Sequence, residues 1–206
     1  MIGIRTVTVL DHLLGSPRLY DRVQKIFGLD ELRRRVGAAL AQFEPGTLLD
    51  VGAGTANFYS VVPDDFEYIA LDVDERKLSR VRQRFPDVRT VRGSGTDVPL
   101  GDASVDYTLC VDVSHHLDDD ELKQLIHELA RITGRKLLFV DALRVPHLPN
   151  RLFWALDRGN HPRPADALRR ELGRHFALQR FETFKIHHVY AIAVAIPRPP
   201  KSDVPG

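Results

Sequence analysis

Residues 48–61, LLDVGAGTANFYSV, decide the fold that we predict for this chain. The apolar residues at the start of the stretch, with Asp50 as the single charge among them, indicate the end of a buried strand. Gly52, Ala53 and Gly54 then predict a turn, and a short helix is expected directly after it. Glycine lets a ligand approach the main chain closely, and the first N–H groups of a new helix can bind a polar group. The stretch therefore predicts a site for the polar end of a nucleotide-like ligand.

A second acidic residue stands at the end of the next predicted strand. Asp72, in the segment YIALDVDE, follows Gly52 by twenty residues, and a carboxylate there can accept both hydrogen bonds of a ribose diol. A dinucleotide fingerprint would require a third glycine, G-x-G-x-x-G, whereas Asn57 occupies that position. Binding of a pyrophosphate is therefore disfavoured, and a nicotinamide-dependent reductase remains only as an alternative.

Length and composition indicate one compact domain. The chain has 206 residues, of which 43% are hydrophobic and 28% charged, which is enough to bury a substantial core. Its net charge of +1 provides no general field that would attract nucleic acid. Cys110 is the only cysteine, so no internal disulfide can form. The N-terminus lacks a secretory signal pattern, and no apolar run approaches the ~20 residues that span a bilayer. We expect a soluble, cytoplasmic protein.

Strands and helices are predicted to alternate along most of the chain. Two helices are expected before the first strand, the first of them ended by Gly28. Asp118 begins the clearest amphipathic helix, and Pro164 opens a later one before two strands at 177–185 and 188–196. The other expected elements are a short helix at 55–62, a helix capped by Asp74, and strands at 67–73, 88–91, 107–113 and 136–142.

Several motifs together resemble the class I S-adenosylmethionine-dependent methyltransferases, in particular small bacterial methyltransferase-11-like members. The D-x-G-x-G pattern that begins at Asp50 is similar to their first motif, with Ala56 where glycine is usual. The segment RGSGTDVPLGDASVDYTLCV, residues 92–111, resembles their pattern around strands three and four, except that Ser94 stands where an aspartate usually accepts the adenine amino group. The segment SHHL, residues 114–117, is also similar. The resemblance covers residues 10–196.

This resemblance implies a doubly wound, mostly parallel seven-stranded sheet with helices on both faces and an antiparallel C-terminal strand. It divides the single domain into an N-terminal helical lid at residues 1–45 and a Rossmann-like core at 46–196. Within the core, an insertion at 143–164 is expected to shape the acceptor pocket. The proline-rich tail, residues 197–206, is predicted to be disordered.

The resemblance also implies S-adenosylmethionine as the cofactor, with S-adenosylhomocysteine as the product. Each part of the cofactor is assigned to its own group of residues. Asp50, Gly52, Ala53 and Gly54 would hold the amino-acid end, Asp72 the ribose diol, Val73, Ser94, Gly95 and Thr96 the adenine, and Val111 and Asp112 the methionine side, with Tyr20 as a contact from the N-terminal arm.

Two histidines are the first candidates for a catalytic base. His116 would stand beside the cofactor, where a packing role is also open, and His161 lies in the proline-rich insertion. Asp141 and His147 are less favoured. A metal site built from His115, His116 and the adjacent aspartates is disfavoured, because those aspartates suit a helix N-terminus. No metal is therefore predicted.

The acceptor is predicted to be a hydrophobic small molecule that carries a hydroxyl, such as a secondary metabolite. The segments expected to wall its pocket are rich in apolar and aromatic residues, including Leu19, Tyr20, Phe153 and Trp154. Neither segment has the dense basic surface that nucleic acid would require. Besides the reductase, two alternatives stay open: a cyclase that binds S-adenosylmethionine without transferring its methyl group, and a non-enzymatic regulator.

Overall fold

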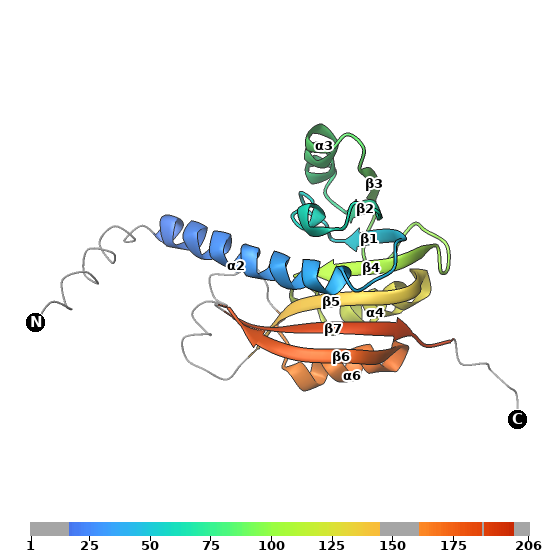
Figure 1. Cartoon of the computed structure of the whole chain (residues 1–206). Helices are drawn as coiled ribbons and strands as arrows, with labels where there is room; N and C mark the ends of the chain where they lie inside the picture. The colour runs from blue at the N-terminus through green and yellow to red at the C-terminus, as the bar shows by residue number, and fades with distance from the viewer. Residues whose placement is uncertain (1–16, 145–160, 187, 200–206) are drawn as a thin grey trace, which may run out of the picture.

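A twisted seven-stranded sheet forms the centre of the molecule (Figure 1). The computed structural model describes residues 17–144, 161–186 and 188–199, with side chains from residue 28 onward. The strand order is β3-β2-β1-β4-β5-β7-β6. The strands are β1 (Thr47–Val51), β2 (Glu67–Asp72), β3 (Arg89–Arg92), β4 (Val105–Val111), β5 (Thr133–Leu143), β6 (Phe176–Lys185) and β7 (Val189–Pro197).

The pairing of the strands confirms the predicted fold class. Strands β1 to β5 pair in parallel, whereas β7 runs antiparallel to both of its neighbours, β5 and β6. The last of the described strands is thus inserted between two earlier ones. The result is a doubly wound, mostly parallel sheet of seven strands with an antiparallel C-terminal strand.

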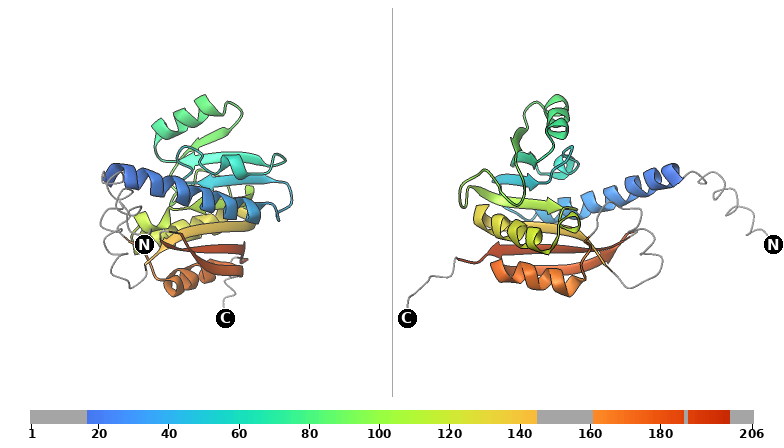
Figure 2. Two further views of the ribbon diagram at one scale, coloured as in Figure 1. Left: turned by 60° about the vertical axis from the view of Figure 1, so that its left-hand side comes forward. Right: turned by 180° about the vertical axis from the view of Figure 1, so that it is seen from behind.

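Helices cover both faces of the sheet (Figure 2). The buried side chains of α2 (Pro17–Leu40) and α3 (Glu75–Arg84) belong to one apolar cluster, and those of α4 (Asp119–Ile132) and α6 (Ala165–His175) belong to the other. The view from behind brings α4 and α6 to the front. Two short 3-10 helices, η1 (Tyr59–Val61) and η2 (Ser114–His116), lie in the connections after β1 and β4. None of the described helices is long and apolar enough to cross a membrane.

Local hydrogen bonds explain why α4 begins where it does. Asp118 caps the helix, because its carboxylate accepts the N–H groups of Asp120 and Glu121, and the carboxylate of Glu121 accepts the N–H of Asp118 in return. This reciprocal capping box satisfies N–H groups that have no partner inside the helix. The acidic run that begins at Asp118 was predicted at a helix start, and its first residue caps α4.

Two predicted helix boundaries are wrong. Gly28 does not end a helix, since α2 runs unbroken from Pro17 to Leu40. Glycine in a helix interior costs only about 1 kcal/mol relative to alanine, which packing of the helix can offset. The helix expected at 55–62 is also absent from the structure, which has turns and the brief η1 there. Gly54 and Ala56 both have positive φ, at 60° and 58°, a conformation that an α-helix does not contain.

The topology brings several loops to one edge of the sheet. The chain moves from β1 outward to β2 and β3, and then returns to the opposite side of β1 to form β4. The carboxyl ends of β1 and β4 are therefore adjacent, but their connections leave in opposite directions. In an open sheet of this kind, ligands bind in the crevice at such a switch point.

Candidate functional site

A cavity of about 260 Å³ lies at the carboxyl ends of β1, β2 and β4. Its described wall includes residues from the glycine turn, from the ends of these strands, and from the segments that follow β3 and β4. The wall consists of Val51, Gly52, Leu71, Asp72, Val73, Lys77, Gly93, Ser94, Gly95, Thr96, Asp112, Val113, His116, Leu117 and Leu125. The cavity thus gathers segments that are far apart in the sequence.

The glycine turn requires glycine at its first position. Gly52 has a φ of +76°, and a Cβ atom placed there would lie 2.5 Å from Cγ2 of Val113. The N–H groups of Gly52 and Ala53 both donate to the carbonyl of Leu71, at 2.8 and 2.9 Å. The N–H of Gly54 donates to Asp72. The turn therefore uses these three N–H groups to join β1 to β2, rather than leaving them free at the start of a helix.

Asp72 lies in the cavity wall. Its side chain is 5% exposed, and its two oxygens accept the N–H groups of Gly54 and Asp74, both at 2.9 Å. The Nζ atom of Lys77 lies 3.5 Å from one of these oxygens. A carboxylate has about four acceptor positions, so it can still accept hydroxyl hydrogen bonds after these contacts. Asp72 can therefore bind a diol while it orders the turn.

The next part of the wall offers an apolar surface and a polar turn. Val73 is 61% exposed although it is apolar, and it faces the cavity. Across from it, the Ser94 hydroxyl accepts the N–H of Thr96 at 3.1 Å and shares a hydrogen bond of 2.7 Å with the Thr96 hydroxyl. Ser94 thus shapes this turn through its hydroxyl. A Cβ atom at Gly95 would lie 2.8 Å from Leu125, which explains the glycine.

Asp112 and His116 mark the β4 end of the cavity. Asp112 has a φ of +56°, and its N–H donates to the carbonyl of Val140 in β5 at 3.0 Å. This bond fixes the point at which the chain leaves the sheet. His116 follows in η2 and lines the cavity. Both residues therefore lie at the β4 end of the cavity wall.

Not all of the residues assigned to the cofactor line this cavity. Of the described ones, Asp50, Ala53, Gly54 and Val111 lie outside its wall. The carboxyl of Asp50 accepts a hydrogen bond of 2.6 Å from the Tyr68 hydroxyl in the core. Burial raises the pKa of Asp50 to about 7, against the lowering effect of that hydrogen bond. The cofactor contacts assigned to Asp50, Ala53, Gly54 and Val111 stay predictions.

Three further predicted residues lie outside the described side chains or outside the cavity wall. The side chain of Tyr20 lies outside the described part of the structure. His161 is exposed, and its backbone N–H donates to the carbonyl of His115 at 3.0 Å. That bond brings the segment around His161 next to η2. The His147 prediction falls outside the described residues.

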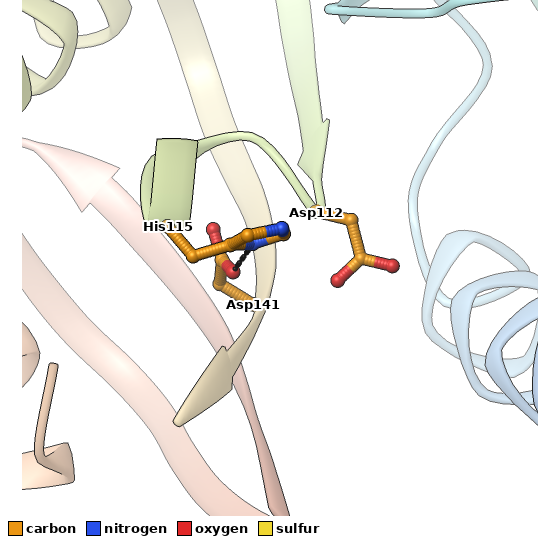
Figure 3. Close-up of side chains that lie close together, drawn as sticks. All are labelled: Asp112, His115 and Asp141. Carbon is orange, nitrogen blue, oxygen red and sulfur yellow. Dashed lines mark hydrogen bonds and ion pairs between the residues drawn. The ribbon is translucent and has the colours of Figure 1, made fainter. Parts of the chain in front are cut away.

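The structure pairs two residues that the sequence analysis did not join. His115 Nδ1 lies 2.6 Å from Asp141 Oδ1, between η2 and β5 (Figure 3). Asp112, His115 and Asp141 each place one potential ligand atom within 4.8 Å of the other two. The oxygens of Asp141 already accept three hydrogen bonds, from Ser114 N, Ala142 N and the His115 ring. The arrangement therefore suits a hydrogen-bonded network better than a cation.

Arg163 fastens the end of the insertion to this region. Its side chain, 11% exposed, donates to the carbonyls of Ser114, Leu117 and His161 and to the carboxylate of Asp119, at 2.8 to 3.0 Å. The sequence analysis assigned no role to this arginine. An isolated charged residue between prolines gives no signal for such a role. Lys77, which lies beside Asp72 in the cavity wall, could have been found, because it stands in the helix that follows Asp72 in the sequence.

Comparisons with known proteins agree with this geometry. Residues 48–135 match the family described as methyltransferase domain. An uncharacterized methyltransferase-like protein of Schizosaccharomyces pombe is 33% identical over 94 residues, which cover 45% of this chain and 37% of that protein. A probable S-adenosylmethionine-dependent methyltransferase of Mycobacterium tuberculosis is 34% identical over 93 residues, which cover 45% of this chain and 31% of that protein. The match spans well under half of the length of these curated relatives.

Solved structures share the fold at low sequence identity. Magnesium protoporphyrin IX methyltransferase from Synechocystis, with bound SAH, has a TM-score of 0.68 at 18% identity, over 86% of this chain and 85% of that chain. The cyclase SpnF has a TM-score of 0.66 at 16% identity, over 82% of this chain and 81% of that chain. Residues 48–135 are thus similar to the methyltransferase-domain family, and the chain has the fold that solved methyltransferases share.

Proposed function

We propose that this chain binds S-adenosylmethionine in the cavity and transfers its methyl group to a hydroxyl of a hydrophobic small molecule. The observation that carries the proposal is the adjacency of Asp72 and Val73, a buried carboxylate beside an exposed apolar side chain at the end of β2. A carboxylate in this position accepts ribose hydroxyls. An exposed apolar surface next to it suits the face of an adenine ring.

The wall of the cavity supports one order of the cofactor's parts. Adenine lies between Val73 and the turn at 94–96, the ribose at Asp72, and the methionine part over Gly52 toward Asp112. The ribose hydroxyls then meet a carboxylate that is already oriented by two backbone N–H groups. Its lone pairs are fixed before the ligand arrives, which lowers the entropic cost of binding.

Methyl transfer demands little covalent chemistry from the protein. The sulfonium is an activated donor, so the main task is to align the acceptor with the methyl carbon, and such orientation contributes about 7 to 11 kcal/mol. A base that removes the acceptor's proton adds a factor of roughly 10² to 10⁴ in rate. His116 at the cavity and His161 next to η2 are the candidates that the sequence supplies for this base.

The class of the acceptor rests on the sequence. The apolar and aromatic residues around Leu19, Phe153 and Trp154 support a hydrophobic pocket, and their side chains lie outside the described part of the structure. The net charge of +1 gives no support to a nucleic-acid substrate. We therefore favour a hydroxylated hydrophobic metabolite in the cytoplasm.

Calorimetry with S-adenosylmethionine and S-adenosylhomocysteine tests the cofactor site. Asp72→Asn keeps an oxygen that can accept the N–H of Gly54 but removes the charge, and it should weaken binding by about 1.5 to 3 kcal/mol, which is roughly 10- to 150-fold. Asp87→Asn is the matched control, because Asp87 is exposed in the turn before β3 and lies outside the described wall of the cavity. Equal affinities for wild type and Asp72→Asn would refute the assignment.

Methyl-transfer assays test the reaction and the acceptor. Hydrophobic phenols and hydroxylated metabolites are offered with S-adenosylmethionine, and tRNA and peptides serve as controls. A methylated small molecule supports the proposal, whereas methylation confined to RNA or peptide rejects the acceptor class. Tight cofactor binding with no methylated product in any panel would favour the cyclase or regulator alternative. Titration with nicotinamide dinucleotides tests the reductase alternative.

A further inference from the structure

Two side chains of α4 hold the segment that connects β3 to β4. Residues 98–103 form neither helix nor strand, so their backbone groups lack the partners that a regular element would provide. The carboxylate of Glu128 accepts the N–H of Val98 at 2.9 Å. The guanidinium of Arg131 donates to the carbonyls of Val98 and Leu100, at 3.0 and 2.8 Å. The start of this segment is therefore attached to α4.

Glu128 and Arg131 also bind each other, which fixes the position of both. Nε and Nη2 of Arg131 donate to the two carboxylate oxygens of Glu128, at 2.8 and 2.7 Å. The side chain of Glu128 is 8% exposed and that of Arg131 is 25% exposed. Hydrogen bonding to Arg131 lowers the pKa of Glu128, so the pair is ionised at neutral pH. The planar guanidinium can hold a carboxylate and two carbonyls at once, which an ammonium cannot do.

The segment held by α4 is continuous with the turn that lines the cavity. This turn, residues 94–96, follows Gly93, whose N–H donates to the carbonyl of Asp72 at 3.2 Å. A Cβ atom at Gly93 would lie 2.6 Å from Cδ of Pro99, so Pro99 packs directly against the start of the turn. A displacement of segment 98–103 would therefore displace the turn as well.

The same helix contacts the turn directly. Leu125 lies three residues before Glu128 on α4, and it belongs to the cavity wall. A Cβ atom at Gly95 would lie 2.8 Å from Cδ1 of Leu125, so the backbone of the turn rests on this side chain. The turn is thus placed relative to α4 by Leu125 beneath it and by the pair Glu128 and Arg131 at the residues that follow it.

We propose that Glu128 and Arg131 are positioning residues for the base of the cofactor: by holding segment 98–103, they keep the turn at 94–96 in the conformation that recognises adenine. This inference rests on the proposed function and adds to it, since neither residue belongs to the described wall of the cavity. A turn that is ordered before the ligand arrives costs less entropy to bind, and it presents its polar groups in one geometry. Loss of the pair should therefore weaken binding and reduce the selectivity for adenine.

Calorimetry with two ligands tests the selectivity. S-inosylhomocysteine is S-adenosylhomocysteine with hypoxanthine in place of adenine, so the two differ at the edge that carries the amino group. We expect the wild type to prefer adenine by about 10-fold or more, since the wrong base leaves hydrogen-bonding groups unpaired. Arg131→Met keeps much of the apolar stem but donates no hydrogen bond. It should bind S-adenosylhomocysteine about 3- to 10-fold more weakly and show a smaller preference for adenine.

Two further variants accompany Arg131→Met. Glu128→Gln retains an oxygen that can accept the N–H of Val98 but loses the charge that pairs with Arg131, so its preference for adenine should fall in the same direction by a smaller factor. It carries the same comparison if Arg131→Met does not fold. Lys123→Met is the matched control, because Lys123 lies on α4, is 52% exposed and pairs with the exposed Asp120. Its preference should equal that of wild type.

Hydrogen exchange in the full chain without ligand locates the effect. The N–H groups of Thr96, Asp97 and Val98 all donate hydrogen bonds in or beside the turn. In Arg131→Met they should exchange about 10-fold faster than in wild type, as expected for loss of a hydrogen bond to a charged group. The N–H groups of α6 should keep their wild-type rates. Saturation with S-adenosylhomocysteine should restore most of the protection of the turn.

The outcomes distinguish this inference from the function on which it rests. Absence of S-adenosylhomocysteine binding to the wild type would reject the function, and the inference with it. Binding without a preference for adenine in the wild type would overturn the inference alone. The same holds if the preference is equal in wild type, Arg131→Met and Glu128→Gln, even where stability falls, because a pair that only stabilises the fold would weaken both ligands by the same factor.

Discussion

The carboxyl of Asp50 lies in the core beneath the glycine turn, where it accepts a hydrogen bond from Tyr68. Burial raises the pKa of Asp50 from an ordinary value of 3.8 to about 7. Between these values the folded chain holds a proton that the unfolded chain has released, so this residue's contribution to stability falls as pH rises toward 7 and is constant above it. Each unit of the shift corresponds to about 1.4 kcal/mol.

Asp50→Asn should remove this part of the pH dependence. Its amide oxygen can still accept the hydrogen bond from Tyr68, and it has no proton to lose. Urea unfolding at several values between pH 5 and 8 should therefore show a flatter stability profile for the variant than for wild type. The exposed Asp87→Asn is the control, and identical slopes for wild type and Asp50→Asn would contradict the prediction.

Replacement of Gly52 by alanine should cost both stability and cofactor affinity. The new Cβ would combine a φ of +76° with a contact of 2.5 Å to Val113, which lines the cavity. A loss of about 1 to 3 kcal/mol is expected for strain of this kind. Gly54→Ala separates the two causes, because its φ is +60° but nothing lies within 4 Å of the new atom.

Unfolding and calorimetric measurements on both glycine variants, with Gly173→Ala as control, check the argument. Gly173 lies in α6 with open space around it, so alanine there should maintain or increase stability. If Gly52→Ala lowers stability and cofactor affinity no more than Gly54→Ala does, the contact with Val113 contributes to neither.

At the scale of elements, Arg163 joins the chain after the insertion to η2 and to the start of α4. Arg163→Ala leaves several backbone carbonyls without a charged donor, and we expect a loss of about 1.5 to 3 kcal/mol in the free energy of unfolding. Arg163→Lys should recover little, because an ammonium cannot reproduce the planar fork that reaches all of these acceptors.

Arg174→Ala provides the control for Arg163, since Arg174 in α6 is 61% exposed and pairs with Glu171. A surface pair of this kind contributes about 0 to 1 kcal/mol. Equilibrium unfolding compares the two variants, and hydrogen exchange at the N–H of His161 reports whether the segment stays attached to η2. Equal stabilities for Arg163→Ala and Arg174→Ala would show that the attachment is weak.

Element boundaries show what sequence patterns can and cannot specify. The acidic run at Asp118 predicted the start of α4, because a cap depends on residues only a few positions away. Gly28 misled the prediction of α2, because glycine lowers helix propensity without forbidding a helix that packing supports. The helix expected at 55–62 failed for a different reason: the left-handed conformation of Ala56 cannot be read from its type.

For the whole molecule, the order and type of the strands could be predicted, and so could the edge at which the site forms. Alternating apolar segments and a glycine turn specify a doubly wound sheet, and its switch point then follows from topology. The pairing of His115 with Asp141 could not be predicted, because it depends on the register between β4 and β5 over 26 residues of separation. Side-chain partners across strands require coordinates.

The place of β7 in the sheet has a consequence for how the chain is made. A ribosome produces β5 and β6 before β7, yet β6 reaches the sheet only through β7, which pairs with both of them. Until the residues up to Pro197 have left the ribosome, the edge of β5 has no partner and β6 has nothing to join. An unpaired strand edge is a template for aggregation. The sheet is therefore complete only once β7 has been made, and a chain that stops before residue 189 would leave the edge of β5 unpaired.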